Sequence, residues 1–180
     1  NKPLATVDPN SGYRGKIMGQ PGNSDELMVF LTFSGGGTRA SAFSYGVLEE
    51  LRKTEVNING QKRMLLHEVD GISGVSGGSF TAAYYGLFGD RIFEDFEQKF
   101  LRKNVQGGLT RRILIRPDNW VRLLSPFFQR SDLAAEYYDK ILFEKKTFRD
   151  MEARKGQSPM VHINATDMVT GIRVAFHQDA

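Results

Sequence analysis

The chain has 180 residues, of which 40% are hydrophobic and 25% charged, and this fits one globular domain with a substantial core. Its formal net charge of +3 is too small to indicate a nucleic-acid partner. Cysteine is absent and no metal-binding motif such as His-Glu-x-x-His is present, so we predict neither disulfides, nor a metal, nor another cofactor. No stretch approaches the ~18 consecutive apolar residues of a membrane-spanning helix. The composition leaves the oligomeric state open.

The first 25 residues differ from the rest in composition. They contain three prolines and four glycines and show no hydrophobic periodicity, which predicts an extended arm or linker. The chain begins with Asn1 and not with Met, so we expect a protein that has been processed or cut. Residues 26–180 are the predicted domain.

Strands and helices alternate from residue 27 onward. The nearly continuous apolar run over 27–33 predicts a strand that is buried on both faces. A glycine-rich loop follows, and then an amphipathic helix over 41–56, in which Phe43, Val47 and Leu51 recur at four-residue spacing.

The order of strand, glycine-rich turn and helix then occurs a second time. Residues 67–74 predict a strand and 79–89 a helix, which continues to residue 101 with three phenylalanines on one stripe. The later predicted elements are a helix over 131–143 with Ser131 as its N-cap, a strand over 160–166, a turn over 167–171 and an edge strand over 172–177. This alternation predicts an α/β fold with a mainly parallel sheet.

The first glycine-rich loop is Ser34-Gly35-Gly36-Gly37-Thr38-Arg39-Ala40. Its glycines allow backbone N–H groups to approach a ligand closely, and the helix N-terminus behind them favours negative charge. One interpretation is a nucleotide-binding module, because Gly35-x-Gly37-x-x-Ala40 fits G-x-G-x-x-G/A and Glu55 follows Gly35 by 20 positions. No Gly-Lys-Ser/Thr follows, which excludes a Walker loop.

The second glycine-rich loop is Gly74-Val75-Ser76-Gly77-Gly78, which fits G-x-S-x-G between a predicted strand and a predicted helix. This is the context of a nucleophile elbow, in which a strained turn exposes the central serine and the flanking residues must be small. Ser73 and Ser79 lie outside the central position, and we interpret them as turn and helix-start residues.

Together the two loops and the run NATDMVTG, Asn164 to Gly171, resemble the patatin-like phospholipases over residues 27–177. The oxyanion loop of that family reads D-G-G-G-x-R-G, and its serine elbow is G-x-S-x-G. The chain differs at Ser34, where the family usually has Asp, and at Ala40, where it has Gly. The resemblance implies a three-layer α/β fold with helices on both faces of the sheet, and a hydrolase that cleaves ester bonds of phospholipids or related lipids.

The resemblance also implies roles for individual residues. Ser76 is the expected nucleophile, and Arg39 is expected to position the loop or an anionic head group. The backbone N–H groups expected to form the oxyanion hole belong to Gly35, Gly36, Gly37 and Gly77.

The family completes a Ser-Asp dyad with an Asp in a D-G-G or D-G-A motif, and no such motif is present in this chain. Asp70-Gly71 lies on the strand that enters the elbow and is followed by Ile72. We interpret Asp167 as a turn residue that caps its own backbone. Asp179 is followed by Ala180, so we expect the dyad Asp, and the remainder of the catalytic domain, to lie beyond residue 180.

Two further interpretations fit the sequence. An α/β-hydrolase triad of Ser76, Asp167 and His177 has the correct chain order, although the acid and the histidine flank one predicted hairpin. A relative without activity that serves as a binding domain would also fit a missing Asp.

Residues 102–130 contain seven Lys or Arg and one acid, interleaved with apolar residues that include Trp120. Such a basic amphipathic stretch predicts either a helical cap over the active site or a peripheral contact with an anionic membrane. From the resemblance to exported bacterial proteins we expect an extracytoplasmic location, periplasmic or membrane-associated, with a cytoplasmic one as the alternative.

Overall fold

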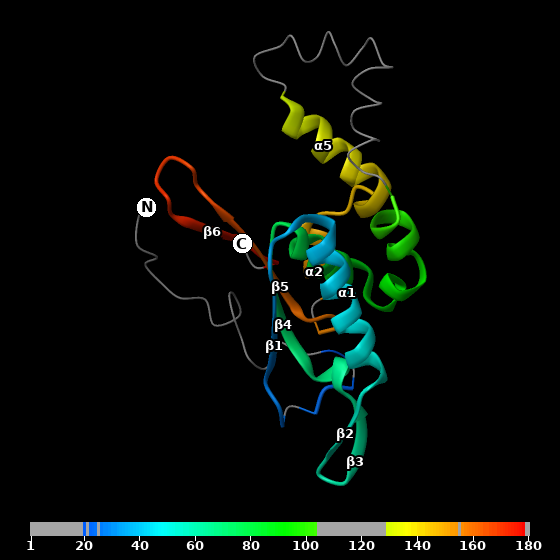
Figure 1. The fold of residues 1–180 in the computed structure, drawn as a ribbon. Helices are drawn as coiled ribbons and strands as arrows, with labels where there is room; N and C mark the ends of the chain where they lie inside the picture. The colour runs from blue at the N-terminus through cyan, green and yellow to red at the C-terminus, as the bar shows by residue number, and fades with distance from the viewer. Residues whose placement is uncertain (1–19, 21, 25, 104–128, 155, 179–180) are drawn as a thin grey trace.

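The computed structural model describes residues 20, 22–24, 26–103, 129–154 and 156–178 (Figure 1). The central sheet contains β1 (Val29–Phe33), β4 (Val69–Val75), β5 (Met160–Thr166) and β6 (Arg173–Phe176), and a separate hairpin contains β2 (Glu55–Ile58) and β3 (Gln61–Met64). The helical elements are α1 (Gly37–Lys53), η2 (Leu65–Glu68), α2 (Gly77–Phe88), η3 (Gly89–Arg91), η4 (Ile92–Leu101), α5 (Arg130–Tyr138), η5 (Asp139–Phe143) and α6 (Phe148–Glu152). Among the described residues, no helix is both long and apolar enough to cross a membrane.

The sheet has the strand order β1-β4-β5-β6, in which β1, β4 and β5 are parallel and β6 is antiparallel to β5. This confirms the predicted α/β class with a mainly parallel sheet. Phe33 at the end of β1 pairs with Gly74, and Val75 at the end of β4 pairs with Asn164. The two glycine-rich loops therefore leave the sheet side by side at the same edge.

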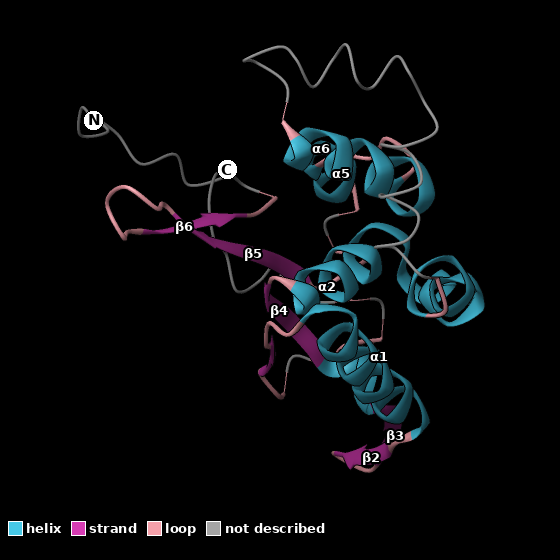
Figure 2. Ribbon diagram, turned by 45° about the horizontal axis from the view of Figure 1, so that its top comes forward, coloured by secondary structure: helices cyan, strands magenta, loops and turns pink. Residues whose placement is uncertain are grey.

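The described helices lie on one side of this sheet in both ribbon views (Figures 1 and 2). The prediction that the first strand is buried on both faces is therefore wrong within the described structure. Leu31 and Phe33 point into the core beneath the helices, whereas Phe30 points to the other face and is 49% exposed. The second helical layer of the three-layer prediction is not among the described residues.

The apolar spacing predicts the buried face of helix α1 only in part, because Val47 and Leu51 pack against the core but Phe43 does not. Phe43 is 76% exposed, and the buried side chains are Ser41, Ser44, Tyr45 and Leu48. The physical reason is the close approach of α1 to the first turn of α2, where the hydroxyl of Ser41 bonds to the backbone of α2. Small serines allow this approach and a phenylalanine does not.

An aromatic cluster under α2 forms much of the core. The predicted stripe of Phe93, Phe96 and Phe100 is confirmed, with Phe96 fully buried and Phe100 nearly so. The Phe96 ring lies 5.0 Å from the ring of Tyr84 on α2 and 5.4 Å from that of Phe100. Rings at such separations add to the apolar burial that holds η4 against α2.

The β2–β3 hairpin, which the helix prediction over 41–56 missed, has a clear sequence signal. Asn59 and Gly60 form its two-residue turn with φ of 52° and 80°, and Asn-Gly is the preferred pair for a turn with two positive φ angles.

The predicted N-cap of the helix that begins near residue 131, Ser131, is wrong. Gln129 caps α5 instead and forms a reciprocal capping box with Asp132.

The end of the predicted arm is attached to the core. The Gln20 amide donates to the carbonyl oxygen of Leu66 at 2.9 Å and accepts from the hydroxyl of Tyr85 at 2.8 Å, and the Ser24 N–H donates to the buried carboxylate of Glu68. Nearly all of the rest of the predicted arm lies outside the described residues, as does the basic insert from residue 104 to residue 128.

Two glycines inside helices offer a test of the packing. A Cβ on Gly86 would lie 2.6 Å from Cγ2 of the buried Val161, whereas a Cβ on Gly46 would meet nothing within 4 Å. We expect Gly86→Ala to lower the free energy of unfolding in urea by about 1 to 3 kcal/mol through overpacking. The control Gly46→Ala should raise it by up to about 1 kcal/mol through helix propensity. Equal stability of the two variants would contradict the packing of α2 on β5.

Candidate active site

Ser76 is exposed at the junction between β4 and α2. Its backbone has φ of 49° and ψ of −115°, a conformation that non-glycine residues rarely adopt and that costs about 1 to 3 kcal/mol. Such strain persists only where the surrounding structure imposes it. The geometry is that of the nucleophile elbow predicted from the sequence.

The glycines around Ser76 are required by contacts with backbone. A Cβ on Gly74 would lie 2.8 Å from Cα of Ser79, and one on Gly78 would lie 2.6 Å from Cβ of Phe33. The N–H of Gly78 also donates to the carbonyl oxygen of Ser34, at 3.2 Å. The elbow therefore fits against the start of the first glycine-rich loop with no room for side chains.

The N-termini of α1 and α2 meet beside Ser76. A Cβ on Gly77 would lie only 2.2 Å from the carbonyl oxygen of Gly37, and one on Gly35 would lie 3.2 Å from Cβ of Ser76. Gly36 and Gly37 have φ of 142° and 66°, which only glycine adopts easily. The four glycines expected in the oxyanion hole are therefore brought together around Ser76.

Neither helix has a side-chain cap or an acidic residue in its first turn. The first N–H groups of a helix have no partner within the helix, and they carry the positive end of its dipole. Two uncapped N-termini that converge on one exposed serine form a place where negative oxygen is stabilised by backbone donors.

Buried side-chain hydrogen bonds hold the two helices in this arrangement. The hydroxyl of Ser41 on α1 donates to the carbonyl oxygen of Gly77 at 2.6 Å. The hydroxyl of Thr81 on α2 donates in return to the carbonyl oxygen of Ser41 at 3.0 Å. Neither residue was singled out from the sequence, because serine and threonine inside helices carry no distinctive signal.

Asn164 fixes the other side of the elbow. Its amide donates to the hydroxyl of Ser73 at 2.8 Å and to the carbonyl oxygen of Gly74 at 3.1 Å, and so joins β5 to the last residues of β4. Ser79 lies inside the first turn of α2, and its hydroxyl is buried without a hydrogen-bond partner among the described residues. Ser76 is thus the exposed serine of the three.

The interpretation of Asp167 as a turn residue agrees with its contacts. Its carboxylate accepts from the Thr170 hydroxyl at 2.6 Å and from the Val169 N–H at 2.9 Å, and these bonds hold the pKa of Asp167 below its usual value. A carboxylate with a lowered pKa is a weaker base. His177 lies at the opposite end of β6, with its ring 5.3 Å from that of His162. The alternative triad of Ser76, Asp167 and His177 is therefore not assembled.

The structure also speaks against a nucleotide-binding module, because Glu55 does not lie near the first glycine-rich loop. Glu55 lies on β2, at the far end of the 17-residue helix α1, about 25 Å along the helix axis from the glycine loop. It forms an ion pair with Lys62 across the hairpin at 3.1 Å. A carboxylate there cannot bind a ribose whose phosphates lie at the N-terminus of α1.

Arg39 lies in the first turn of α1 and is exposed. It therefore lies on the same edge of the sheet as Ser76, and the role expected for it stays a prediction.

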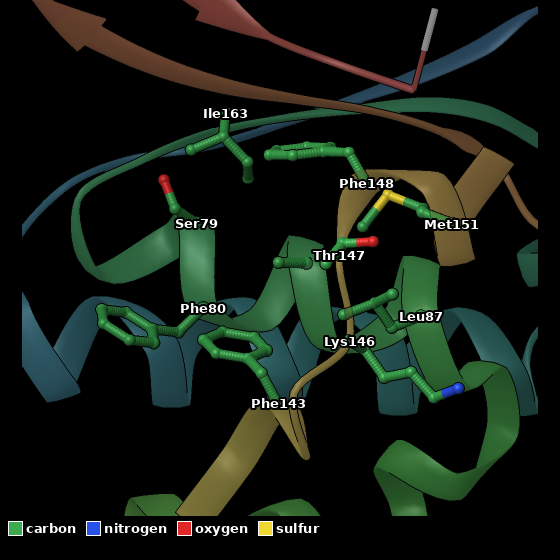
Figure 3. A pocket seen from close by; sticks show the side chains of 10 residues that line it. Ser79, Phe80, Leu87, Phe143, Lys146, Thr147, Phe148, Met151 and Ile163 are labelled. Atoms are coloured by element: carbon green, nitrogen blue, oxygen red, sulfur yellow. The ribbon is translucent and has the colours of Figure 1, made fainter. Parts of the chain in front are cut away.

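An apolar pocket of about 300 Å³ begins one helical turn beyond Ser76 (Figure 3). It lies between α2, β5 and α6, and its floor and walls are almost entirely hydrocarbon. The lining side chains include Phe80, Phe143, Phe148, Met151 and Ile163, with Ser79 at the end nearest the elbow. Neither this pocket nor α6 is predicted from the sequence, although the capping box of Thr147 and Asp150 marks the start of α6.

A sequence model of the patatin-like phospholipase family matches residues 31–174, and the chain belongs to this family. Among solved structures, the chain is similar to human GIVD cytosolic phospholipase A2, which was determined with a methyl γ-linolenyl fluorophosphonate inhibitor and terbium chloride. The TM-score is 0.54 at 19% sequence identity, over 84% of this chain and 23% of that one. This likeness confirms the predicted fold. No curated protein sequence matches significantly.

The link between the two helices can be tested with two buried serines of α1. Ser41→Ala removes the bond to the Gly77 carbonyl, and we expect it to lower the free energy of unfolding by about 1 kcal/mol. Ser44→Ala removes only a bond to Ala40 within the same helix, so its unfolding energy should stay equal or rise slightly through helix propensity. Urea titrations that give both variants the same midpoint would contradict a special role for Ser41.

Proposed function

We propose that this protein is a serine acyl hydrolase that cleaves ester bonds of phospholipids or related lipids. The observation that carries the proposal is the strained, exposed Ser76 beside two uncapped helix N-termini. Membership of the patatin-like phospholipase family supports it. The proposal uses no metal and no organic cofactor.

In the proposed reaction, Ser76 Oγ attacks the acyl carbonyl carbon and its proton passes to a base. The carbonyl oxygen becomes an oxyanion, which accepts hydrogen bonds from backbone N–H groups of the glycines at 35–37 and of Gly77. The tetrahedral intermediate collapses, and the leaving alcohol takes up the proton. Water then attacks the carbonyl carbon of the acyl-serine ester and gives a proton to the base. The second tetrahedral intermediate collapses, Ser76 Oγ leaves and takes up that proton, and the fatty acid is released.

The base in this proposal is an aspartate, as the family's Ser-Asp dyad implies. Asp167 is held in its own turn and Asp70 accepts a hydrogen bond from the Val29 N–H at 2.7 Å, so neither is available to Ser76. Since the family's D-G-G or D-G-A motif is also absent from the 180 residues, we propose that the dyad aspartate lies outside the described residues.

The substrate class follows from the surroundings of Ser76. We assign the acyl chain to the apolar pocket, because a hydrocarbon tail fits walls that offer almost no polar surface. Arg39 would contact the negatively charged head group on the exposed side of the site.

The nucleophile assignment predicts the behaviour of a serine variant. Ser76→Ala should reduce hydrolysis of a short p-nitrophenyl ester to less than about 1% of wild type, because loss of a nucleophile typically removes several orders of magnitude. It should also abolish covalent labelling by a fluorophosphonate, measured as an intact-mass increase. The control Ser44→Ala should keep both properties. Labelling that survives in Ser76→Ala would remove Ser76 from its role.

The acyl pocket predicts a change in chain-length preference. Ala83 lines the pocket, so Ala83→Leu places extra carbon atoms inside it. We expect kcat/KM to fall about tenfold for a decanoate ester, because about two methylenes lose their burial, with little change for a butyrate ester. Ala42→Leu, on the exposed face of α1, is the matched control. Equal losses on both esters would show that the pocket does not bind the chain.

A further inference from the structure

The turn between β5 and β6 exposes apolar side chains to an unusual degree. We call residues 167–172 the hairpin tip. Met168 is 97% exposed, Val169 is 92% exposed and Ile172 is 63% exposed. Both ribbon views show this hairpin leaving the body of the molecule (Figures 1 and 2). A single exposed apolar residue is ordinary, but three on one projecting turn need a physical reason.

The hairpin tip is an ordered turn that satisfies its own polar groups. The N–H of Asp167 donates to the carbonyl oxygen of Ile172 at 2.9 Å, and the N–H of Gly171 donates to the carbonyl oxygen of Asp167 at 2.8 Å. The Asp167 carboxylate accepts from Val169 and Thr170. Several backbone and side-chain polar groups therefore already have partners, and this lowers the free-energy cost of moving the tip out of water.

The tip projects from the edge of the sheet that carries Ser76. Asn164 on β5 pairs with Val75, which directly precedes Ser76. Beyond that pair, β5 continues for two residues and adds about 7 Å before the turn begins. Since β4 and β5 are parallel, the tip extends past the nucleophile elbow on the same side of the molecule.

We propose that the hairpin tip inserts shallowly into the surface of a phospholipid bilayer and holds Ser76 at that surface; this rests on the proposed function. The tip presents hydrocarbon at its end, and its one acidic residue, Asp167, is engaged in the turn. Arg173 at the base of the tip and Arg39 beside the elbow are exposed cations that suit anionic lipid head groups.

A bilayer fits the tip better than a second protein chain does. A stable protein interface buries about 1,000 Å² or more over a broad surface. The exposed apolar side chains of this hairpin are few, with Val174 and Phe176 on β6 less exposed than the tip, and the most exposed ones are gathered at its projecting end. Insertion to the boundary between head groups and acyl chains, in contrast, requires only a small apolar surface. The basic insert, for which the sequence predicts either a helical cap or a membrane contact, lies outside the described residues from 104 to 128.

Vesicle binding of the intact protein tests the proposal. The double variant Met168→Ser/Val169→Ser should bind vesicles of phosphatidylcholine and phosphatidylglycerol about 10- to 100-fold more weakly in a sedimentation assay. The matched control is Met28→Ser, because Met28 is 73% exposed but precedes β1 at the opposite edge of the sheet. Hydrolysis of a soluble butyrate ester should be unchanged in both variants. Equal vesicle binding by wild type and the double variant would overturn the proposal.

A fluorescent dye on the hairpin tip distinguishes contact with a bilayer from contact with a second protein chain. The 180 residues contain no cysteine, so Met168→Cys can carry an environment-sensitive dye at one place in this region. We expect its emission to shift to the blue when vesicles are added and not when protein concentration is raised. A shift with protein concentration alone would assign the tip to a second copy, and no shift with vesicles would reject membrane insertion. Loss of butyrate hydrolysis in Ser76→Ala tests the proposed function separately, because that assay contains no membrane.

Discussion

The candidate site depends on one backbone contact, in which Gly77 at the start of α2 lies against the carbonyl group of Gly37 at the start of α1. A side chain at position 77 would overlap that carbonyl oxygen, so only glycine permits the contact. The contact brings the positive ends of two helix dipoles to one point. Everything chemical at this edge of the sheet, including the donors around Ser76, follows from that convergence.

The rest of the fold keeps this contact in place. The parallel pairing of β1 with β4 sets the two loops beside each other, and Asn164 ties β5 to the strand that leads into Ser76. The aromatic core under α2 supplies apolar burial that offsets the strain stored at Ser76. Helix α2 thus serves both parts of the site: its first turn holds the elbow in place, and its side chains line the apolar pocket.

Much of the site could be predicted from the sequence, because glycine is required where the backbone has a positive φ or lies too close to other atoms for a side chain. Gly77 and Gly78 marked a loop in which a Cβ has no room, and the structure shows the atoms of Gly37 and Phe33 that exclude it. The roles of side chains that act through tertiary contacts could not be predicted from the sequence. Ser41 has no distinctive sequence context, and the exposure of Phe43 depends on how closely α1 approaches α2. The Asn59-Gly60 hairpin was missed although its turn signal is strong, because the helical pattern before it was extended too far.

A crystal structure of the protein after reaction with an alkyl fluorophosphonate would show directly whether Ser76 and the two helix N-termini act together. We expect a phosphorus atom bonded to Ser76 Oγ and a phosphoryl oxygen about 2.7 to 3.1 Å from backbone nitrogens of the glycines at 36, 37 or 77. The alkyl chain should enter the pocket beside Phe80 and Ile163. A phosphoryl oxygen that points away from both helix N-termini, or an adduct on another residue, would contradict the proposed roles of Ser76 and the oxyanion hole.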